Sequence, residues 1–416
     1  MATFKDIEVF AKHLDENYEL FKEKSLKKRR IKHKDITPLI EKTGQNHLFE
    51  KTKLGESTEG RSIFLLKAGS GEIKVLLWSQ MHGNEPTATQ ALFDIFNFLN
   101  AGKELKNDIE QILSNISLYF VPMLNPDGAE AFKRRNALDI DLNRDATRLA
   151  ANESRILKTL HDEIKPDFGF NLHDQNPYYT VSNTEKPATM TFLAPAYNHE
   201  KDINDERKHS MQAIVLMNRV LQKFIPGQVG RYYFDGYGPT SMGDNMQKSG
   251  TRTILIESGE YTGDIERQEV RKLNFIAILS ALKGISEQVC QNLDFEEYNK
   301  MPETNDAKLF HLLIKNAIVI KNGKQFTIDI GINYNEKDNA DCSNFSIVSE
   351  IVDLGDLTYY FGYQEIDANG MTVKRTYASD KEASRQFLNI GDQADFDLTK
   401  DGQVEISIKN GQIINK

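Results

Sequence analysis

The stretch "IKVLLWSQMHGNEPTATQALF", residues 73–93, contains a strand, a polar turn and the start of a helix in succession. Its first eight residues form an apolar run of the length and composition typical of a buried strand. Pro86 suits the first turn of a helix, and apolar residues then recur at helical spacing. His82 and Glu85 therefore lie at the C-terminal end of a predicted strand, where open α/β sheets bind their ligands.

The alternation of strands and helices continues to about residue 290. Apolar runs predict further strands, and apolar residues three and four positions apart predict helices. Strands that alternate with helices indicate an α/β fold, with a sheet covered by helices on both faces. The predicted strands are residues 61–69, 116–124, 167–174 and 251–260, and the predicted helices are residues 5–24, 153–164, 200–224 and 264–288.

The pattern changes after residue 290. Residues 291–310 are polar and are interpreted as a linker, and a short helix is expected over residues 307–316. We therefore predict an α/β domain over residues 1–290, the linker over 291–310 and a small all-β domain over 311–416, in which we find no catalytic constellation. The β domain is predicted from β-patterned runs separated by dipeptides that favour hairpin turns, Asn322-Gly323, Asn369-Gly370, Asp401-Gly402 and Asn410-Gly411.

The composition argues against several classes of protein. A net charge of -9 is atypical of a nucleic-acid-binding protein, and the basic segment 22–35 is interpreted as a solvated helix end and linker. No stretch approaches the roughly 20 apolar residues of a membrane helix, and the first 21 residues lack the apolar core of a signal peptide. Cys290 and Cys342 show no metal-binding spacing, so we expect a cytoplasmic protein.

A catalytic zinc ion requires three protein ligands of the His, Glu or Asp type and one open position. His82 and Glu85 supply two ligands from one turn, although a lone HxxE pattern is a weak signal. Among the nine histidines only His173 repeats the context of His82, an apolar strand followed by histidine and a polar turn. We therefore predict a zinc site formed by His82, Glu85 and His173. His311 falls on the predicted short helix, and the others are expected on solvated faces: His13, His33, His47, His161, His199 and His209.

A hydrolytic metal site also needs a general base. The predicted strand at 251–260 places Glu257 near its C-terminal end, with Glu260 as an alternative. A carboxylate at this edge of the sheet could accept a proton from water and pass it to a leaving amine.

Arginine and asparagine residues are concentrated between the two metal-binding segments, in residues 125–146. The arginine side chain binds carboxylates in a bidentate manner and stabilises developing oxyanions. This region therefore predicts a site for an anionic group, with Arg134, Arg135, Asn136, Asn143 and Arg144 as its candidate residues.

Taken together and in their order, these motifs resemble the zinc metallocarboxypeptidase family of the carboxypeptidase A type. Each motif alone is weak, but the ordered set is specific and spans roughly residues 50–285. The matching segments are "GESTEGRSI" (55–63), "HGNE" (82–85), "NPDG" (125–128), "RRNALDIDLNRD" (134–145), "NLHD" (171–174) and "ILIESGE" (254–260).

The resemblance implies a zinc-dependent enzyme that hydrolyses the C-terminal peptide bond of its substrate. It also implies a mixed, mostly parallel sheet of about eight strands between helices, and some family members append a small β-sandwich, which suits residues 311–416. The roles implied are zinc binding by His82, Glu85 and His173, activation of the zinc-bound water by Glu257, polarisation of the scissile carbonyl by Arg134, and binding of the terminal carboxylate by Asn143 and Arg144.

The sequence departs from the family pattern after His173. There "DQNPYY" (174–179) replaces the usual Ser-Tyr or Thr-Tyr, so the subsite formed by this segment is undefined. The family's mobile tyrosine has three candidates, Tyr232, Tyr233 and Tyr237, and we prefer Tyr237. Met242 and Asp244 are both near the expected base of the specificity pocket, and they imply an apolar and a basic preference, respectively.

Two other functions use the same residues. A zinc deacylase acting on N-acyl amino acids would share the metal ligands and the glutamate. A non-catalytic binding module on the same fold would typically have lost a metal ligand or the general base, but all of these residues are present in this sequence. The complete set of arginine motifs favours the peptidase. The expected partner is thus a peptide or a small amino-acid-derived substrate, with no nucleic acid and no membrane.

Overall fold

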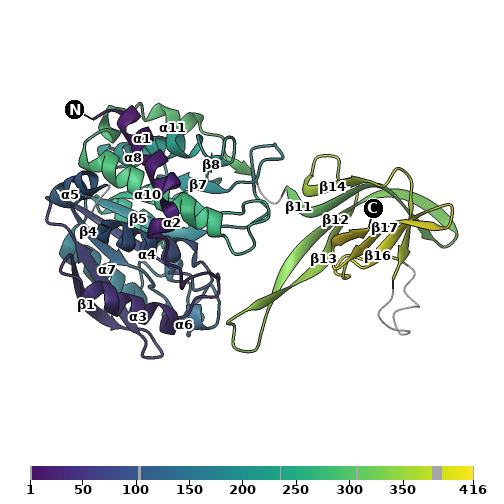
Figure 1. Cartoon of the computed structure of the whole chain (residues 1–416), viewed down its shortest axis with the longest axis horizontal. Coiled ribbons are helices and arrows are strands. Elements are labelled where there is room, and N and C mark those ends of the chain that lie inside the picture. Colours follow the sequence, from purple (N-terminus) through teal and green to yellow (C-terminus); the bar gives the residue numbers. More distant parts are fainter. Residues whose placement is uncertain (1, 102–104, 235, 306–307, 377–386, 416) are drawn as a thin grey trace. The chain divides into compact units, whose positions relative to one another are not determined.

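The computed structural model describes residues 2–101, 105–234, 236–305, 308–376 and 387–415 (Figure 1). The chain forms two compact units. Unit 1 comprises Met1–Pro177 and Ala188–Thr304, and unit 2 comprises Tyr178–Pro187 and Asn305–Lys416. The chain therefore passes into unit 2 twice, which the sequence pattern does not indicate.

Unit 1 is built on a mixed sheet of eight strands, which confirms the predicted fold class. The four central strands are parallel, and an antiparallel pairing follows on either side of them. In spatial order the strands are β1 (Phe49–Glu56), β2 (Ser62–Ala68), β4 (Ile116–Val121), β3 (Ile73–Ser79), β5 (Phe168–Asp174), β9 (Arg252–Ser258), β7 (Met190–Leu193) and β8 (Val229–Arg231).

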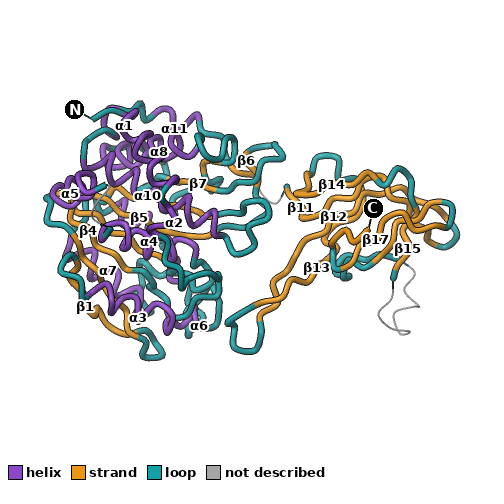
Figure 2. The backbone as a smooth tube through the Cα atoms, in the orientation of Figure 1, coloured by secondary structure: helices purple, strands orange, loops and turns teal. Residues whose placement is uncertain are grey.

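Helices pack against both faces of this sheet (Figure 2). The larger core includes residues of α1, α4, α8 and α10, and the smaller one includes residues of α7 and α9. The helices are α1 (Phe4–Glu16), α2 (Tyr18–Phe21), α3 (His33–Gly44), α4 (Thr87–Asn100), α5 (Lys106–Asn115), α6 (Pro126–Glu130), α7 (Asn152–Ile164), α8 (Asp205–Leu221), α9 (Met242–Lys248), α10 (Gln268–Ser286) and α11 (Glu296–Lys300), with 3₁₀ turns η1 (Leu142–Arg144) and η2 (Cys290–Asn292).

Alternation along the central strands explains the two cores. In β3, Val75 and Leu77 face the larger core, whereas Leu76 and Trp78 face the smaller one. Successive side chains of a strand point to opposite faces, so a strand covered on both faces is apolar throughout.

Among the described residues, none of the helices has both the length and the apolar composition of a membrane-spanning helix.

Unit 2 contains a sheet-rich domain, in agreement with the predicted all-β pattern. Its main sheet has the order β13-β12-β11-β15-β16-β17-β18, with β14 paired to β11. The strands are β6 (Thr180–Val181), β11 (Leu309–Lys321), β12 (Lys324–Asp338), β13 (Phe345–Gly355), β14 (Phe361–Asp367), β15 (Thr372–Arg375), β16 (Phe396–Lys400), β17 (Gln403–Lys409) and β18 (Gln412–Asn415), and β10 (Thr304–Asn305) lies where the chain enters unit 2 for the second time.

Three of the four turn dipeptides form hairpins as predicted. They join β11 to β12, β16 to β17, and β17 to β18, and both residues of each dipeptide have positive φ. The prediction of a hairpin at Asn369-Gly370 is wrong. The strands on either side, β14 and β15, both run parallel to β11, and the Gly370 N–H donates to the Asn316 carbonyl at 3.0 Å. This turn therefore joins two strands that lie in line along β11.

The predicted helix at residues 307–316 is also wrong, because residues from Leu309 onward form β11. The apolar residues Leu309, Leu312 and Leu313 have helical spacing in the sequence. In the structure, however, β11 pairs with β12 on one side and with β14 on the other. Pairing on both edges overrides the local pattern.

Two further expectations about polar residues are corrected. The basic segment 22–35 is not uniformly solvated, because Arg29, Arg30 and Lys32 are buried. The Arg30 guanidinium lies 3.4 Å from the centre of the Phe132 ring. His161 is buried as well, and its Nε2 lies 2.9 Å from Thr251 Oγ1.

The segment predicted as a linker, 291–310, is divided between the units. Its residues up to Thr304 belong to unit 1 and include α11. Tyr298 of α11 is buried, and its hydroxyl accepts a hydrogen bond from the Ala194 N–H at 3.1 Å. An aromatic anchor thus attaches a largely polar segment to unit 1.

Candidate metal centre

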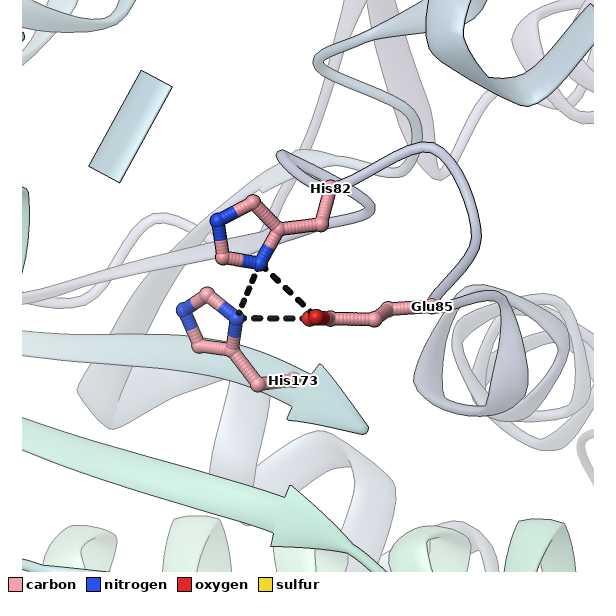
Figure 3. Close-up of side chains that lie close together, drawn as sticks. All are labelled: His82, Glu85 and His173. Atoms are coloured by element: carbon pink, nitrogen blue, oxygen red, sulfur yellow. Dashed lines mark hydrogen bonds and ion pairs between the residues drawn. The ribbon is translucent and has the colours of Figure 1, made fainter. Parts of the chain in front are cut away.

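The three predicted ligands lie together at the carboxyl ends of β3 and β5 (Figure 3). His82 Nδ1 lies 2.8 Å from Glu85 Oε1 and 3.1 Å from His173 Nδ1. His173 Nδ1 lies 2.7 Å from Glu85 Oε2. Donor atoms about 2.0–2.1 Å from a tetrahedral zinc ion are roughly 3.3 Å apart, so a small outward shift of the three side chains accommodates the ion.

The turn that follows β3 positions two of these ligands. A Cβ atom on Gly83 would lie 1.9 Å from the carbonyl carbon of Gly128, so only glycine fits between His82 and residue 84. The Glu85 N–H donates to the His82 carbonyl at 3.1 Å, which closes the turn, and α4 begins two residues after Glu85. The tight turn before α4 thereby brings the side chains of His82 and Glu85 next to each other.

All three candidate ligands are buried. Burial alone would raise the pKa of Glu85, but the imidazoles of His82 and His173 outweigh it, and the pKa lies below its ordinary value. Burial lowers the pKa of His173, which favours the neutral imidazole. A carboxylate and a neutral imidazole are the forms that bind metal, and two imidazoles with one carboxylate form a donor set suited to zinc.

Asp141 contributes a contact that the sequence did not reveal. Its Oδ1 lies 3.0 Å from His82 Nε2, and its Oδ2 accepts from Arg134 Nε at 3.0 Å. A proton on Nε2 leaves the Nδ1 lone pair of His82 directed toward Glu85 and His173. Carboxylates that hold the second nitrogen of a ligating histidine in this way fix its tautomer and orientation.

Glu257 lies beside His173 on the neighbouring strand. The two residues are register partners in the parallel pair β5 and β9, so their side chains share one face of the sheet. Burial, followed by the nearby carboxylates of Glu85 and Asp174, raises the pKa of Glu257 well above its ordinary value. The alternative base, Glu260, lies beyond the strand, and its carboxylate is 3.7 Å from Arg267 Nε.

Arg134 reaches the cluster from the loop after α6. Its Nη1 lies 3.1 Å from His82 Nδ1 and donates to Glu85 Oε1 at 3.2 Å. The side chain is 43% exposed, so the guanidinium borders solvent as well as the buried ligands. This position allows contact with a molecule that approaches the metal centre from outside.

Asn143 and Arg144 follow on the same loop. The Asn143 N–H donates to Asp141 Oδ1 at 2.9 Å, and its side-chain oxygen accepts from the Met242 N–H at 2.9 Å. Arg144 is exposed, and its Nη1 donates to the Asn143 carbonyl at 2.6 Å. Through Asp141 this pair is connected to the His82 imidazole.

Other predicted substrate-binding residues lie apart from this network. Arg135 is exposed and donates to the Asp139 carbonyl at 2.8 Å. The Tyr237 ring packs edge-on against His199, with ring centres 5.1 Å apart. The roles of Arg135 and Tyr237 remain predictions.

The two candidates for the base of the specificity pocket have different environments. Met242 is fully buried in the smaller core of unit 1. Asp244 accepts from the Gly238 N–H at 2.7 Å, and burial raises its pKa to about 6. Of the two, only Asp244 carries a carboxyl group that could form an ion pair with a basic side chain of a substrate.

Comparisons with known proteins show that part of this chain is similar to zinc carboxypeptidases. Residues 39–193 match the zinc carboxypeptidase family model. "Carboxypeptidase 2" of Trichophyton tonsurans is 30% identical over 108 residues, which are 26% of this chain and 20% of that protein. "Carboxypeptidase D" of Homo sapiens is 28% identical over 201 residues, which are 40% of this chain and 14% of that protein.

The solved structure of a metallo-carboxypeptidase from Burkholderia cenocepacia has a similar fold. It superposes with a TM-score of 0.50 at 17% identity and covers 61% of this chain and 69% of the other. The chain spans a fifth or less of the length of the two curated relatives named above. The family model thus identifies a zinc carboxypeptidase domain over residues 39–193, the relatives are similar to it in sequence, and the solved structure is similar in fold.

Proposed function

We propose that this protein is a zinc metallocarboxypeptidase, which hydrolyses the C-terminal peptide bond of a peptide. The observation that carries the proposal is the connection from His82 through Asp141 to Asn143. A donor set for zinc and a candidate carboxylate-binding pair thereby form one hydrogen-bonded arrangement. An enzyme that removes a terminal residue needs both, at a fixed distance from each other.

Each polar side chain has a distinct task in this proposal. Arg144 and Asn143 bind the terminal carboxylate of the substrate, because a guanidinium and an amide provide directed N–H donors for an anion. Arg134 donates to the oxygen of the scissile carbonyl as negative charge develops on it. A zinc ion held by His82, Glu85 and His173 supplies Lewis-acid polarisation of the reacting oxygens when bound.

Glu257 performs the proton transfers. Its raised pKa strengthens it as a base relative to an ordinary glutamate, so its carboxylate accepts a proton from the attacking water. The same carboxyl group then donates that proton to the nitrogen of the leaving amino acid. Burial beside His173 keeps the group close to the reacting atoms and limits exchange of the proton with solvent.

A substrate panel tests the proposal. Matched peptides with a free and an amidated C-terminus are incubated with the zinc-loaded protein, together with N-acyl amino acids. We expect release of single C-terminal amino acids from the free peptides and little from the amidated ones. Hydrolysis of N-acyl amino acids without cleavage of peptides would identify a deacylase instead, and cleavage of internal bonds would identify an endopeptidase.

A further inference from the structure

Glu153 is a buried carboxylate that has no task in the reaction proposed above. It lies in the first turn of α7, and the residue is fully buried. Its Oε1 accepts from the Thr58 N–H at 3.2 Å, and its Oε2 accepts from Asn136 Nδ2 at 3.1 Å. A buried charge is costly unless it is hydrogen-bonded. The carboxylate therefore joins two loops of unit 1, the one between β1 and β2 and the one that carries Arg134.

Asn136 organises the turn between Arg134 and Asp141. Its Oδ1 accepts from the backbone N–H groups of Leu138 and Ile140, both at 3.0 Å. The Asn136 N–H donates to the Ile140 carbonyl, also at 3.0 Å. The side chain and the main chain of one residue thus close this turn from within.

Glu153 determines which way the Asn136 amide faces. A carboxylate accepts hydrogen bonds and donates none, so it requires Nδ2, whereas the N–H groups of Leu138 and Ile140 require Oδ1. A reversed amide would place donors against donors on the turn side and an oxygen against the carboxylate on the other. Asn136 is only 4% exposed, so water has little access to replace the lost partners. The contact with Glu153 therefore selects the one orientation that closes the turn.

The two ends of this turn meet at the candidate metal centre. Arg134 Nε donates to Asp141 Oδ2 at 3.0 Å, and Asp141 Oδ1 lies 3.0 Å from His82 Nε2. Arg134 Nη1 donates to Glu85 Oε1 at 3.2 Å. A change in the turn would shift both Arg134 and Asp141 relative to the two candidate ligands.

We propose that Glu153 is a positioning residue, which fixes the turn at 136–140 through Asn136 and thereby places Arg134 and Asp141 at the metal centre. The bond from Thr58 to its other oxygen restrains the carboxylate, so that Oε2 stays directed at Asn136. The effect on catalysis rests on the proposed carboxypeptidase function. The effect on the turn and on the metal ligands does not.

The test exchanges the two partners. Glu153→Gln keeps the shape of the side chain but accepts on one side only, and Asn136→Asp places two carboxylates against each other. When both substitutions are combined, the introduced amide donates to the introduced carboxylate. That carboxylate still accepts from Leu138 and Ile140, and the oxygen of the introduced amide still accepts from Thr58. The double variant therefore restores every bond that each single variant loses.

Kinetics at saturating zinc with an N-blocked dipeptide provide the first measurement. Each single variant should lower kcat roughly 10- to 100-fold, because Arg134 is displaced from the developing oxyanion. KM should change less than kcat, because Asn143 is held separately by the Met242 N–H. The double variant should return kcat to near the wild-type value, as expected of two coupled residues in contact. Glu163→Gln makes the same chemical change at an exposed position near the other end of α7 and should alter neither constant.

Hydrogen exchange of the Leu138 and Ile140 amides and zinc affinity, measured by competition with a chelator, do not depend on turnover. Both single variants should exchange faster at these amides. Their zinc affinity should fall by less than the roughly 10–100-fold typical of losing a direct partner of a ligating histidine. The double variant should reverse both changes.

Wild-type kcat in the single variants would overturn the inference, as would a folded double variant that stays as impaired as they are. A wild type without C-terminal peptidase activity would instead refute the proposed function. Exchange and zinc affinity would then decide whether Glu153 positions the turn and the metal ligands. If neither single variant folds, the double variant decides alone: kcat near wild type supports the inference, and a low kcat or failure to fold overturns it.

Discussion

His173 and Glu257 are register partners on adjacent parallel strands, β5 and β9. Neighbouring strands are about 4.8 Å apart, so a candidate metal ligand and the candidate general base are held side by side by backbone hydrogen bonds. The pairing of two strands, rather than a loop, therefore sets the distance between His173 and Glu257. Because the two residues lie on different strands, metal binding and proton transfer can be tested by separate mutations.

Glu257→Gln should retain zinc and stability but lose roughly 10²–10⁴-fold in kcat, because the amide cannot accept the proton from water. Activity and metal content of the same preparation are the measurements. The matched control is Glu260→Gln, because Glu260 faces Arg267 rather than the metal centre. A variant pair in which Glu260→Gln is inactive and Glu257→Gln is active would assign the base to Glu260.

His173→Ala should abolish stoichiometric zinc binding. Only His82 and Glu85 would remain as protein ligands, whereas catalytic zinc sites use three. Elemental analysis of the purified variant beside wild type measures this, and chelation of wild type should remove zinc and activity together. His13→Ala, an exposed histidine on α1, is the control and should keep the metal. Equal zinc in wild type and His173→Ala would exclude His173 as a ligand.

Asp141→Asn should weaken zinc binding about 10–100-fold, because the amide no longer favours the proton on His82 Nε2. Competition with a chelator of known affinity measures this change. Asp139→Asn alters an exposed carboxylate two residues earlier in the same loop and should leave the affinity unchanged. A similar loss in both variants would indicate a general effect on the loop.

His311 makes the stability of unit 2 depend on pH. Burial lowers its pKa to about 4, whereas an unfolded histidine has a pKa of about 6.5. Between these values the unfolded chain binds a proton that the folded unit excludes. The free energy of unfolding therefore falls as the pH decreases from about 6.5 to 4, by up to roughly 3 kcal/mol, and is unaffected by this group above that window.

His311→Phe should remove this part of the pH dependence. Hydrogen exchange of the β11 and β12 amides between pH 7 and pH 5, corrected for intrinsic exchange, follows the stability of unit 2 in the full chain. We expect a smaller loss of protection at low pH in the variant than in wild type. The same pH slope in both proteins would show that other groups cause it.

That the three candidate ligands lie together could be predicted because the relevant information is local. His82 and Glu85 follow one apolar strand, His173 lies at the end of another, and parallel strands end at the same edge of a sheet. Asp141 could not be selected, because nothing local separates it from Asp139 or Asp145. Only the three-dimensional contact with His82 identifies it.

Long-range contacts account for the other differences between prediction and structure. Burial of Arg29 is accompanied by a bond from its backbone N–H to Glu266, which lies more than 200 residues away in the sequence. The segment Tyr178–Pro187 belongs to unit 2 because of residues near 309–334, which no pattern near 178 reveals. Helical spacing at β11 is likewise overridden by pairing with β12 and β14.

Arg144→Ala tests whether the enzyme recognises a free C-terminus. Arg144 is exposed beside Asn143, so its guanidinium is accessible to a substrate carboxylate. Loss of a charge-assisted contact should lower kcat/KM for a free peptide by roughly 10- to 150-fold, which corresponds to about 1.5–3 kcal/mol. The amidated form of the same peptide should be a poor substrate of wild type, and the mutation should change its rate little.

The difference between the two peptides is the decisive quantity. Removal of the carboxylate and removal of the arginine form a double-mutant cycle, in which a direct contact appears as strong coupling. Arg148→Ala, which changes another exposed arginine four residues later, should affect both peptides equally and slightly. If Arg144→Ala also lowered kcat/KM equally for both peptides, Arg144 would not bind the terminal carboxylate. An endopeptidase, or a deacylase that anchors its substrate elsewhere, would then be the better explanation.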